Sequence, residues 1–113
     1  MSREWTLFLD DVIAACAEAA ELTRGLDLAA FVADRRTKLA TMRLVEVIGE
    51  AARSVPDDVR AAHPEVAWRA LIGMRNVLAH AYFSVDDEIL WDVVHREVPV
   101  LLELLESIRE NLN

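Results

Sequence analysis

The sequence predicts an all-α fold, an up-and-down bundle of four main helices joined by short helical pieces. Two observations carry this prediction. The 113 residues include only three glycines and three prolines, so residues that break helices are scarce. Hydrophobic residues recur at i, i+3 and i+4 along most of the chain, and no alternating run of β-branched residues indicates a strand. The length fits a single domain spanning residues 1–113.

The first predicted helix covers residues 3–23. Its hydrophobic residues follow helical spacing and include Trp5, Phe8, Leu9, Val12, Ile13, Cys16, Ala19 and Ala20. Gly25 is expected to end this segment, because glycine commonly follows the last turn of a helix. Asp27 can then cap a short helix that runs through Phe31 and Val32.

A long helix is predicted from about 34 to 54, with an apolar stripe that contains Leu39, Met42, Val45, Ile48 and Ala52. The Ser-Val-Pro-Asp segment at 54–57 is expected to stop this helix and to begin a short capped turn. The next helix is predicted to open at His63 and Pro64, with the proline near its first turn, and to run to about 81.

The last predicted helix follows a turn at 84–88 and runs to about 111. Asp86, Asp87 and Glu88 favour a helix N-terminus there, because the positive end of the helix dipole attracts carboxylates. Pro99 lies inside this helix and has no backbone N–H to donate. We therefore expect a kink or a break near residues 96–98.

The composition excludes several classes of protein. Hydrophobic residues make up 54% of the chain, which is too many for a disordered protein. Cys16 is the only cysteine, so a disulfide scaffold and a cysteine-rich zinc site are excluded. No apolar run approaches the ~18 residues of a membrane span, and the N-terminal residues contain no signal-peptide core. We expect a cytoplasmic protein with no metal, no cofactor and no membrane partner.

The formal net charge of −8 is unevenly distributed. Residues 1–34 carry −5, residues 35–80 carry +3 and residues 81–113 carry −6, so the middle third is a basic island in an acidic chain. This island is either a set of solvated helix faces or a local site for an anion. The basic side chains Arg35, Arg36, Lys38 and Arg43 fit the same two readings, since they can line an RNA path or face solvent.

The helix predicted over 66–81 breaks the usual amphipathic pattern. At about 100° per residue, only a narrow stripe that contains Arg69, Gly73, Asn76 and His80 departs from an otherwise apolar circumference. Such a helix is expected to be buried nearly all round. In a domain this small, contact with a second copy of the chain would provide that burial.

Arg75 is the exception on the apolar side of this helix. A buried guanidinium needs a partner, because leaving it unpaired costs several kcal/mol. Glu46 and Glu50 on the preceding long helix are both candidates. Asn76 and His80 are i, i+4 neighbours on the stripe and can share a ligand.

Residues 75–82, Arg-Asn-Val-Leu-Ala-His-Ala-Tyr, resemble the Arg-Asn-x-x-x-His-x-Tyr signature of the HEPN superfamily. Within that superfamily the chain is similar to the HepT-like group, formerly called DUF86. The similarity covers the whole chain, and further segments that share it are residues 47–52 and 73–76, Trp68, the turn at 85–86 and Trp91. One departure is visible, since Ala67 stands where the group often has proline.

The resemblance implies a HEPN-like homodimer that acts as a metal-independent ribonuclease. Carried over residue by residue, Arg75 and His80 are catalytic and Asn76 shapes the site. The residue types suit this chemistry, because a histidine can take the proton of the ribose 2′-hydroxyl and an arginine can clamp the phosphate. Arg69 shares the polar stripe and is a possible contact for an RNA phosphate.

The resemblance also implies a partner. HepT-like toxins belong to type VII-like toxin–antitoxin systems, in which a minimal nucleotidyltransferase antitoxin of the MntA type transfers AMP to the tyrosine of the motif. That tyrosine is Tyr82 in this sequence. A bulky anionic nucleotide on Tyr82 would exclude RNA from the neighbouring His80 and Arg75.

Two other readings stay open on the sequence alone. The chain could be a non-catalytic dimeric HEPN module that binds nucleotide or regulates a nucleotidyltransferase partner, which its acidic balance would suit. It could also be a helical interaction protein in which Arg75 and His80 are structural groups.

Overall fold

The computed structural model describes residues 4–81 and 86–112, apart from the side chains of residues 77 and 79–81. The prediction of an all-α fold is confirmed, because the described residues are almost entirely helical and include no strand. In chain order the helices are α1 (Trp5–Leu22), α2 (Leu28–Ala33), α3 (Arg35–Arg53), α4 (Asp57–Ala62), α5 (Trp68–Ala81), α6 (Asp87–Asp92), the π-helical turn η2 (Val93–Glu97) and α7 (Val98–Glu110).

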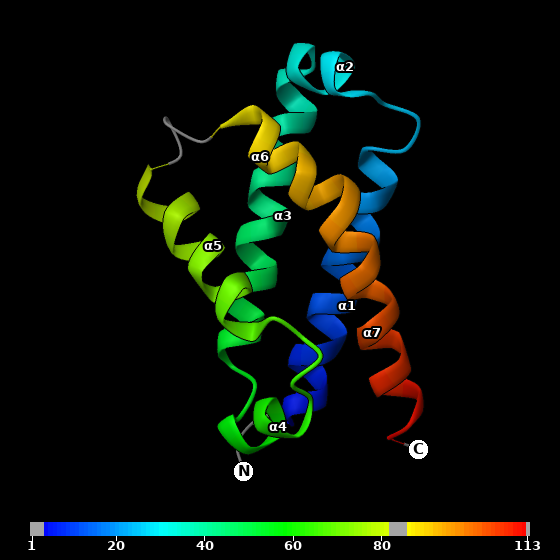
Figure 1. Cartoon of the computed structure of the whole chain (residues 1–113), viewed down its shortest axis with the longest axis vertical. Helices are drawn as coiled ribbons and strands as arrows, with labels where there is room; N and C mark the ends of the chain where they lie inside the picture. The colour runs from blue at the N-terminus through cyan, green and yellow to red at the C-terminus, as the bar shows by residue number, and fades with distance from the viewer. Residues whose placement is uncertain (1–3, 82–85, 113) are drawn as a thin grey trace.

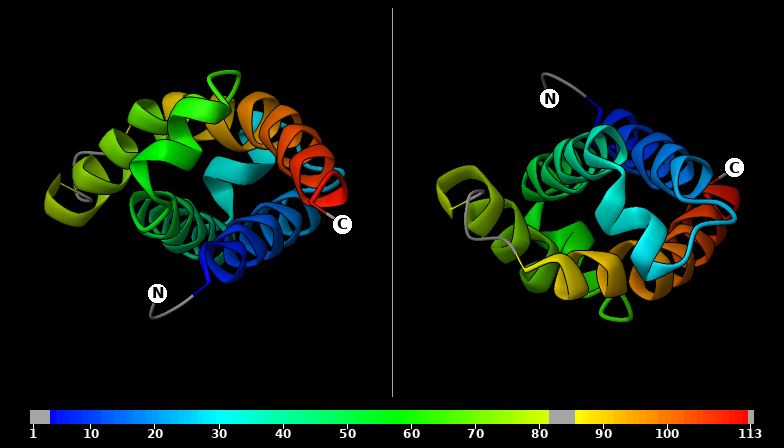
Figure 2. Two further views of the ribbon diagram at one scale, coloured as in Figure 1. Left: turned by 90° about the horizontal axis from the view of Figure 1, so that it is seen from below. Right: turned by 90° about the horizontal axis from the view of Figure 1, so that it is seen from above.

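The long helix α3 lies between α1 and α5 in the bundle (Figures 1 and 2). It packs against α1 on one side and against α5 on another, while α7 packs against α1. The helix α5 rests chiefly on α3, and both views along the bundle show it outermost (Figure 2). Much of the surface of α5 is therefore not covered by the rest of its own chain.

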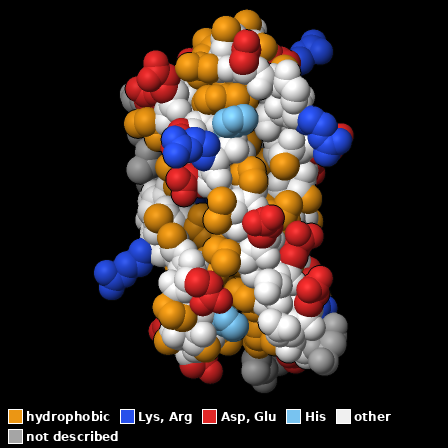
Figure 3. All heavy atoms as spheres, turned by 45° about the vertical axis from the view of Figure 1, so that its right-hand side comes forward, with side chains coloured by type: hydrophobic (Ala, Val, Ile, Leu, Met, Phe, Trp, Pro, Cys, Tyr) orange, Lys and Arg blue, Asp and Glu red, His pale blue; other side chains and the backbone are white. Residues whose placement is uncertain are grey.

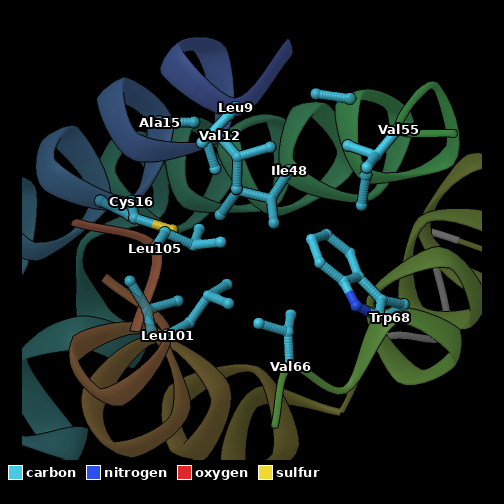
Figure 4. Packing of buried hydrophobic residues seen from close by; sticks show 14 of the residues in the cluster. Leu9, Val12, Ala15, Cys16, Ile48, Val55, Val66, Trp68, Leu101 and Leu105 are labelled. Carbon is cyan, nitrogen blue, oxygen red and sulfur yellow. The ribbon is translucent and has the colours of Figure 1, made fainter. Parts of the chain in front are cut away.

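The hydrophobic core lies between α1, α3 and α7, and Val66 and Trp68 close its lower end. Figure 4 shows Leu9, Val12 and Cys16 pointing toward Ile48 and Leu105 across this core. The Cys16 thiol is fully buried, and this burial raises its pKa to about 12. Cys16, one of the hydrophobic residues at helical spacing in the first predicted helix, thus lies in the core. None of the described helices is long and apolar enough to cross a bilayer.

Three aspartates fix the starts of helices. The carboxylate of Asp27 accepts from the backbone N–H of Ala30 at 2.8 Å and caps α2, as predicted. The carboxylate of Asp34 accepts from the backbone N–H and the hydroxyl of Thr37, at 3.1 and 2.8 Å, and caps α3. These two hydrogen bonds hold the pKa of Asp34 below its usual range. Asp86 caps α6 in the same manner.

The predicted start of the fifth helix is wrong. The prediction placed it at His63 and Pro64, but α5 begins at Trp68. The intervening residues turn so that Val66 enters the core, and its backbone N–H donates to the carbonyl oxygen of His63 at 3.2 Å. The indole of Trp68 donates to the same carbonyl at 3.0 Å. The free energy gained by burying the side chains of Val66 and Trp68 thus exceeds what one more helical turn would contribute.

The irregularity expected around Pro99 is confirmed, although its form is a π-helical turn and not a break. In η2 the backbone N–H of Val98 donates to the carbonyl of Val93, five residues earlier. The missing N–H of Pro99 leaves the carbonyl of His95 without its usual i+4 donor, and the wider turn accommodates this loss. The helix then continues as α7.

Candidate active site

The helices α3 and α5 approach each other closely at Gly49. A Cβ atom at this position would lie 2.3 Å from Cβ of Arg75 and 2.5 Å from the carbonyl oxygen of Leu71. Only a residue without a side chain lets the two helix backbones come this near. Because Gly49 has no Cβ, the side chain of Arg75 can begin directly beside the backbone of α3.

The side chain of Arg75 lies half-buried between the two helices, with 24% of it exposed. Its Nε donates to Oε2 of Glu50 at 2.8 Å, and its Nη1 donates to Oδ1 of Asn76 at 3.2 Å. Glu50 was one of the two partners that the sequence offered, and the structure selects it. The other, Glu46, pairs with Arg43 on its own helix.

These two hydrogen bonds hold the guanidinium in place but use only some of its N–H donors. An arginine side chain carries five N–H groups, and the described part of the chain engages one on Nε and one on Nη1. No described residue accepts from the remaining three N–H groups, so within the described chain they can serve a bound anion. Two of them on one edge suffice for a bidentate contact to a phosphate.

Arg75 also borders a hollow of about 700 Å³ that runs along α1 and α3. Arg43 lines the same hollow, together with the carboxylates of Asp11, Glu18, Glu46 and Glu50. Arg43 and Arg75 thus lie on one hollow, whereas Lys38, which the sequence grouped with Arg43, pairs with Asp87 at the start of α6. Of the four basic residues proposed for an RNA path, Arg43 is the one that lines this hollow with Arg75.

The polar stripe on α5 is open to solvent in the single chain. Arg69, Gly73 and Asn76 are exposed, and a Cβ on Gly73 would meet nothing within 4 Å. Among the described side chains of α5, Trp68 and Leu78 are buried, each in a cluster that also contains residues of α3. The expectation of a helix buried nearly all round is therefore not met within one chain, because α5 packs chiefly on α3.

The backbone of His80 lies in α5, one turn beyond Asn76. Its side chain is outside the described residues, and so is the whole of Tyr82, which follows the end of the helix. The structure thus joins Arg75, Asn76 and Glu50 directly. It places His80 on the same helix by its backbone alone.

The role of Gly49 went unrecognised in the sequence, where this glycine appeared only as part of a motif. A signal was present, because a glycine inside a long helix costs about 0.5–1 kcal/mol relative to alanine. Its persistence within an apolar stripe, three residues before Ala52, is typical of a close approach between helices.

The remaining histidines lie apart from this site. His63 contacts Glu65, with 3.5 Å between Nδ1 and Oε2, and His95 stacks on Trp91 with 4.8 Å between ring centroids. Among the side chains that the structure describes, no three His, Cys, Asp or Glu residues gather in a way that could hold a metal ion.

Comparison with known proteins gives a consistent set of similarities. Residues 12–108 match the protein family described as Ribonuclease HepT-like. A protein of Thermococcus cleftensis named "Probable ribonuclease HepT" is 37% identical over 110 residues, which cover 97% of this chain and all of that protein. A relative in Methanocaldococcus jannaschii is 33% identical over 106 residues, covering 94% of this chain and 97% of its own length.

A third relative, from Caldanaerobacter subterraneus, is 33% identical over 101 residues, covering 89% of this chain and 90% of its own. The names of the last two relatives carry a provisional RNase assignment. No solved structure gives a significant match.

Proposed function

The chain belongs to the Ribonuclease HepT-like family, and on this premise we propose that it is an endoribonuclease with Arg75 and His80 as its catalytic residues. The observation that carries the proposal is the state of Arg75. Its guanidinium is held by Glu50 and Asn76, yet three of its N–H groups have no acceptor among the described residues and lie at a hollow open to solvent. A purely structural arginine would be expected to spend its donors inside the protein.

The reaction uses the nucleophile that RNA itself carries. His80 takes the proton of the ribose 2′-hydroxyl as the oxygen attacks the adjacent phosphorus. The bond from phosphorus to the 5′-oxygen breaks, and that oxygen receives a proton from a general acid. The products are a 2′,3′-cyclic phosphate and a 5′-hydroxyl. Arg75 binds the phosphate and offsets the charge that develops on it, so the proposed reaction needs no metal.

A homodimer would complete this site, because one chain offers one histidine at the motif and the reaction needs both a base and an acid. Two copies related by a two-fold axis would supply both from two His80 residues. The part of α5 that its own chain leaves uncovered, at Arg69, Gly73 and Asn76, is the surface that would face the second copy and the RNA. Arg69 would contact a neighbouring phosphate there.

We further propose that the chain is the toxin of a type VII-like toxin–antitoxin pair in the cytoplasm. A minimal nucleotidyltransferase of the MntA type would transfer AMP to Tyr82, with release of pyrophosphate from ATP. Tyr82 follows α5 directly, two residues after His80. The added phosphate would lie within reach of the catalytic helix and compete with RNA for Arg75.

The test is cleavage of RNA by the purified chain in EDTA, beside its His80→Ala and Arg75→Ala variants. Each variant is expected to cut about 10²–10⁴-fold more slowly. The matched control is His95→Ala, which removes an exposed histidine of η2 that stacks on Trp91, and it is expected to cut normally. Products ending in 2′,3′-cyclic phosphate are expected from the wild type.

A folded, unmodified dimer that cuts none of a varied set of RNAs would contradict the proposal. The reading as a non-catalytic module, which binds nucleotide or regulates a nucleotidyltransferase, would then stand. Loss of stability in His80→Ala with an unchanged cutting rate would instead assign His80 a structural role.

The role of Tyr82 is tested separately, by incubating the chain with ATP and the nucleotidyltransferase from a HepT-like pair. Intact-mass spectrometry is expected to show one added adenylyl group on the wild type and none on Tyr82→Phe. The modified protein is expected to lose its cutting activity. Equal modification of Tyr82→Phe would exclude Tyr82 as the acceptor.

A further inference from the structure

A second groove, also of about 700 Å³, lies between α5 and the α6–α7 segment, with α3 as its floor. Its floor and walls are apolar and include Val45, Ile48, Leu71, Met74, Val93 and Leu104. Figure 3 shows hydrophobic side chains around a hollow in the middle of one face of the molecule, with acidic side chains at its margins.

Two side chains on the wall of this groove are unusually open to solvent. Ile89 is 58% exposed and Val100 is 57% exposed, and no other large hydrophobic residue in the described part of the chain is exposed as much. Both line the groove. Exposed apolar surface gathered at one hollow is typical of a surface that binds another molecule.

The rim of the groove is strongly acidic. Five carboxylates line it, and none of the described residues that do so is Lys, Arg or His. Asp92 forms an ion pair with Arg96, with 3.3 Å between Oδ1 and Nη1, and the carboxylate of Asp86 caps α6. Glu88 and Glu97 make no ion pair within the described chain. An occupant with positive charge at its edges is therefore favoured.

The apolar part of the groove offers nothing to orient a small polar ligand. Apart from the carboxylates, every described lining residue is Ala, Val, Ile, Leu or Met, with no hydroxyl or amide among them. Small-molecule sites usually add a few convergent polar groups to such a surface. The groove instead offers apolar contact along its length.

The walls of the groove have helical spacing. On one wall Ala67, which directly precedes α5, is followed on α5 by Ala70 or Leu71 and by Met74, at steps of three or four residues. On the other wall Ile89, Val93, Glu97, Val100 or Leu101, and Leu104 do the same. A third helix can lie between these two rows of side chains and pack its apolar face onto the floor of the groove.

We propose that this groove docks a helix of a partner protein, one with an apolar face bordered by Lys and Arg. The charge argument favours such a partner over a second copy of this chain, whose net charge is −8. The proposal does not rest on ribonuclease activity. At about 100° per residue, Met74 in the groove lies about 160° around α5 from Asn76 at the candidate active site.

The test uses a synthetic helical peptide of about 18 residues, with Leu at i, i+3, i+4 and i+7 and Lys on both borders. Its binding to the full chain is measured by fluorescence anisotropy. A second peptide with Glu in place of each Lys is the charge control. We expect the Lys peptide to bind with a micromolar Kd that weakens with salt, and the Glu peptide to bind at least about 100-fold more weakly.

Two pairs of variants separate docking in the groove from general attraction to an acidic chain. Val100→Asp and Glu97→Lys alter the groove, and each is expected to weaken the Lys peptide at least about tenfold. Their matched controls are Leu7→Asp on α1 and Glu103→Lys on α7, which are exposed and lie outside the groove. The controls are expected to change Kd less than about twofold. All four replaced residues are exposed in the single chain, so the fold is expected to tolerate each change.

Equal weakening by the groove variants and their controls would overturn the proposal, because the attraction would then be diffuse. A Kd weaker than about 1 mM for the wild type would do the same. Sedimentation velocity provides a further arm. If Val100→Asp separates a wild-type dimer into monomers, the groove is an interface between two copies and the proposed occupant is wrong. RNA cleavage by the variants, measured in parallel, keeps the outcome apart from that of the proposed function.

Discussion

Replacing Gly49 by alanine is expected to displace Arg75 while leaving most of the fold intact. The new Cβ would lie 2.3 Å from Cβ of Arg75 and 2.5 Å from the carbonyl oxygen of Leu71. Both of these atoms belong to the start of a side chain or to the backbone, so neither can swing aside. Relief requires the two helices to separate by at least about 1 Å to reach ordinary van der Waals contact.

The expected cost follows from two opposing effects. Overpacking of this kind destabilises a protein by about 1–3 kcal/mol. Alanine recovers up to about 1 kcal/mol, because it is the better helix former. The net loss in free energy of unfolding is therefore about 1–2 kcal/mol. The effect on catalysis is larger, since a shift of about 1 Å in a catalytic group can reduce the rate about 100-fold.

Urea unfolding, followed by tryptophan fluorescence, measures the first effect, and cleavage of a defined RNA by excess protein measures the second. Gly73→Ala is the matched control for the stability measurement alone, because it makes the same change on α5, where a Cβ would meet nothing within 4 Å, but lies on the surface proposed to face RNA. The control is expected to gain up to about 1 kcal/mol in free energy of unfolding. Gly49→Ala with the stability and the cutting rate of the wild type would refute the argument that this contact positions Arg75.

Three further predictions follow from individual contacts. Glu50→Ala removes the carboxylate that holds Arg75, and RNA cleavage is expected to fall about tenfold. Urea unfolding is expected to show a loss of less than about 1 kcal/mol in the free energy of unfolding, because Glu50 is 59% exposed. An unchanged cutting rate would show that Asn76 alone suffices to position Arg75. Asp34→Ala is expected to lower the melting temperature at pH 7. Because the pKa of Asp34 is depressed in the folded chain, its contribution is present above the unfolded pKa of about 4 and is lost as pH falls through the folded value, so the two melting curves should converge in acid. Cys16, whose buried thiol has a pKa of about 12, is expected to react with a thiol reagent at pH 8 only after unfolding; rapid labelling of the native chain would place it at the surface.

The helices were largely predictable because their signals are local. Caps at Asp27 and Asp34 and the apolar periodicity around them depend on neighbours within one or two turns. The start of α5 was not predictable in this way. Its position depends on Val66 and Trp68 entering a core that residues distant in the sequence build. The proline signal at Pro64 was real but marked a turn before the helix.

The candidate site shows the same division. An arginine on an apolar stripe predicted a carboxylate partner. The sequence offered two candidates for it, Glu46 and Glu50, both on the preceding long helix. Which of the two pairs with Arg75 depends on which face of α3 is turned toward α5. That orientation cannot be predicted from the sequence of either helix alone. Once Gly49 faces Arg75, Glu50 follows it on the same helix and is within reach, whereas Glu46 lies beside Arg43.

Two consecutive residues of α3 therefore perform two different tasks for one residue of α5. Gly49 lets the backbones approach, and Glu50 directs the guanidinium that this approach brings near. Because α5 packs chiefly on α3, the position of Arg75 depends mainly on this contact. The same isolation leaves two other sides of α5 uncovered, one toward the polar stripe and one toward the apolar groove. A helix attached along one side alone can thus position the arginine that we propose as catalytic and still leave separate surfaces for the proposed RNA, second copy and partner helix.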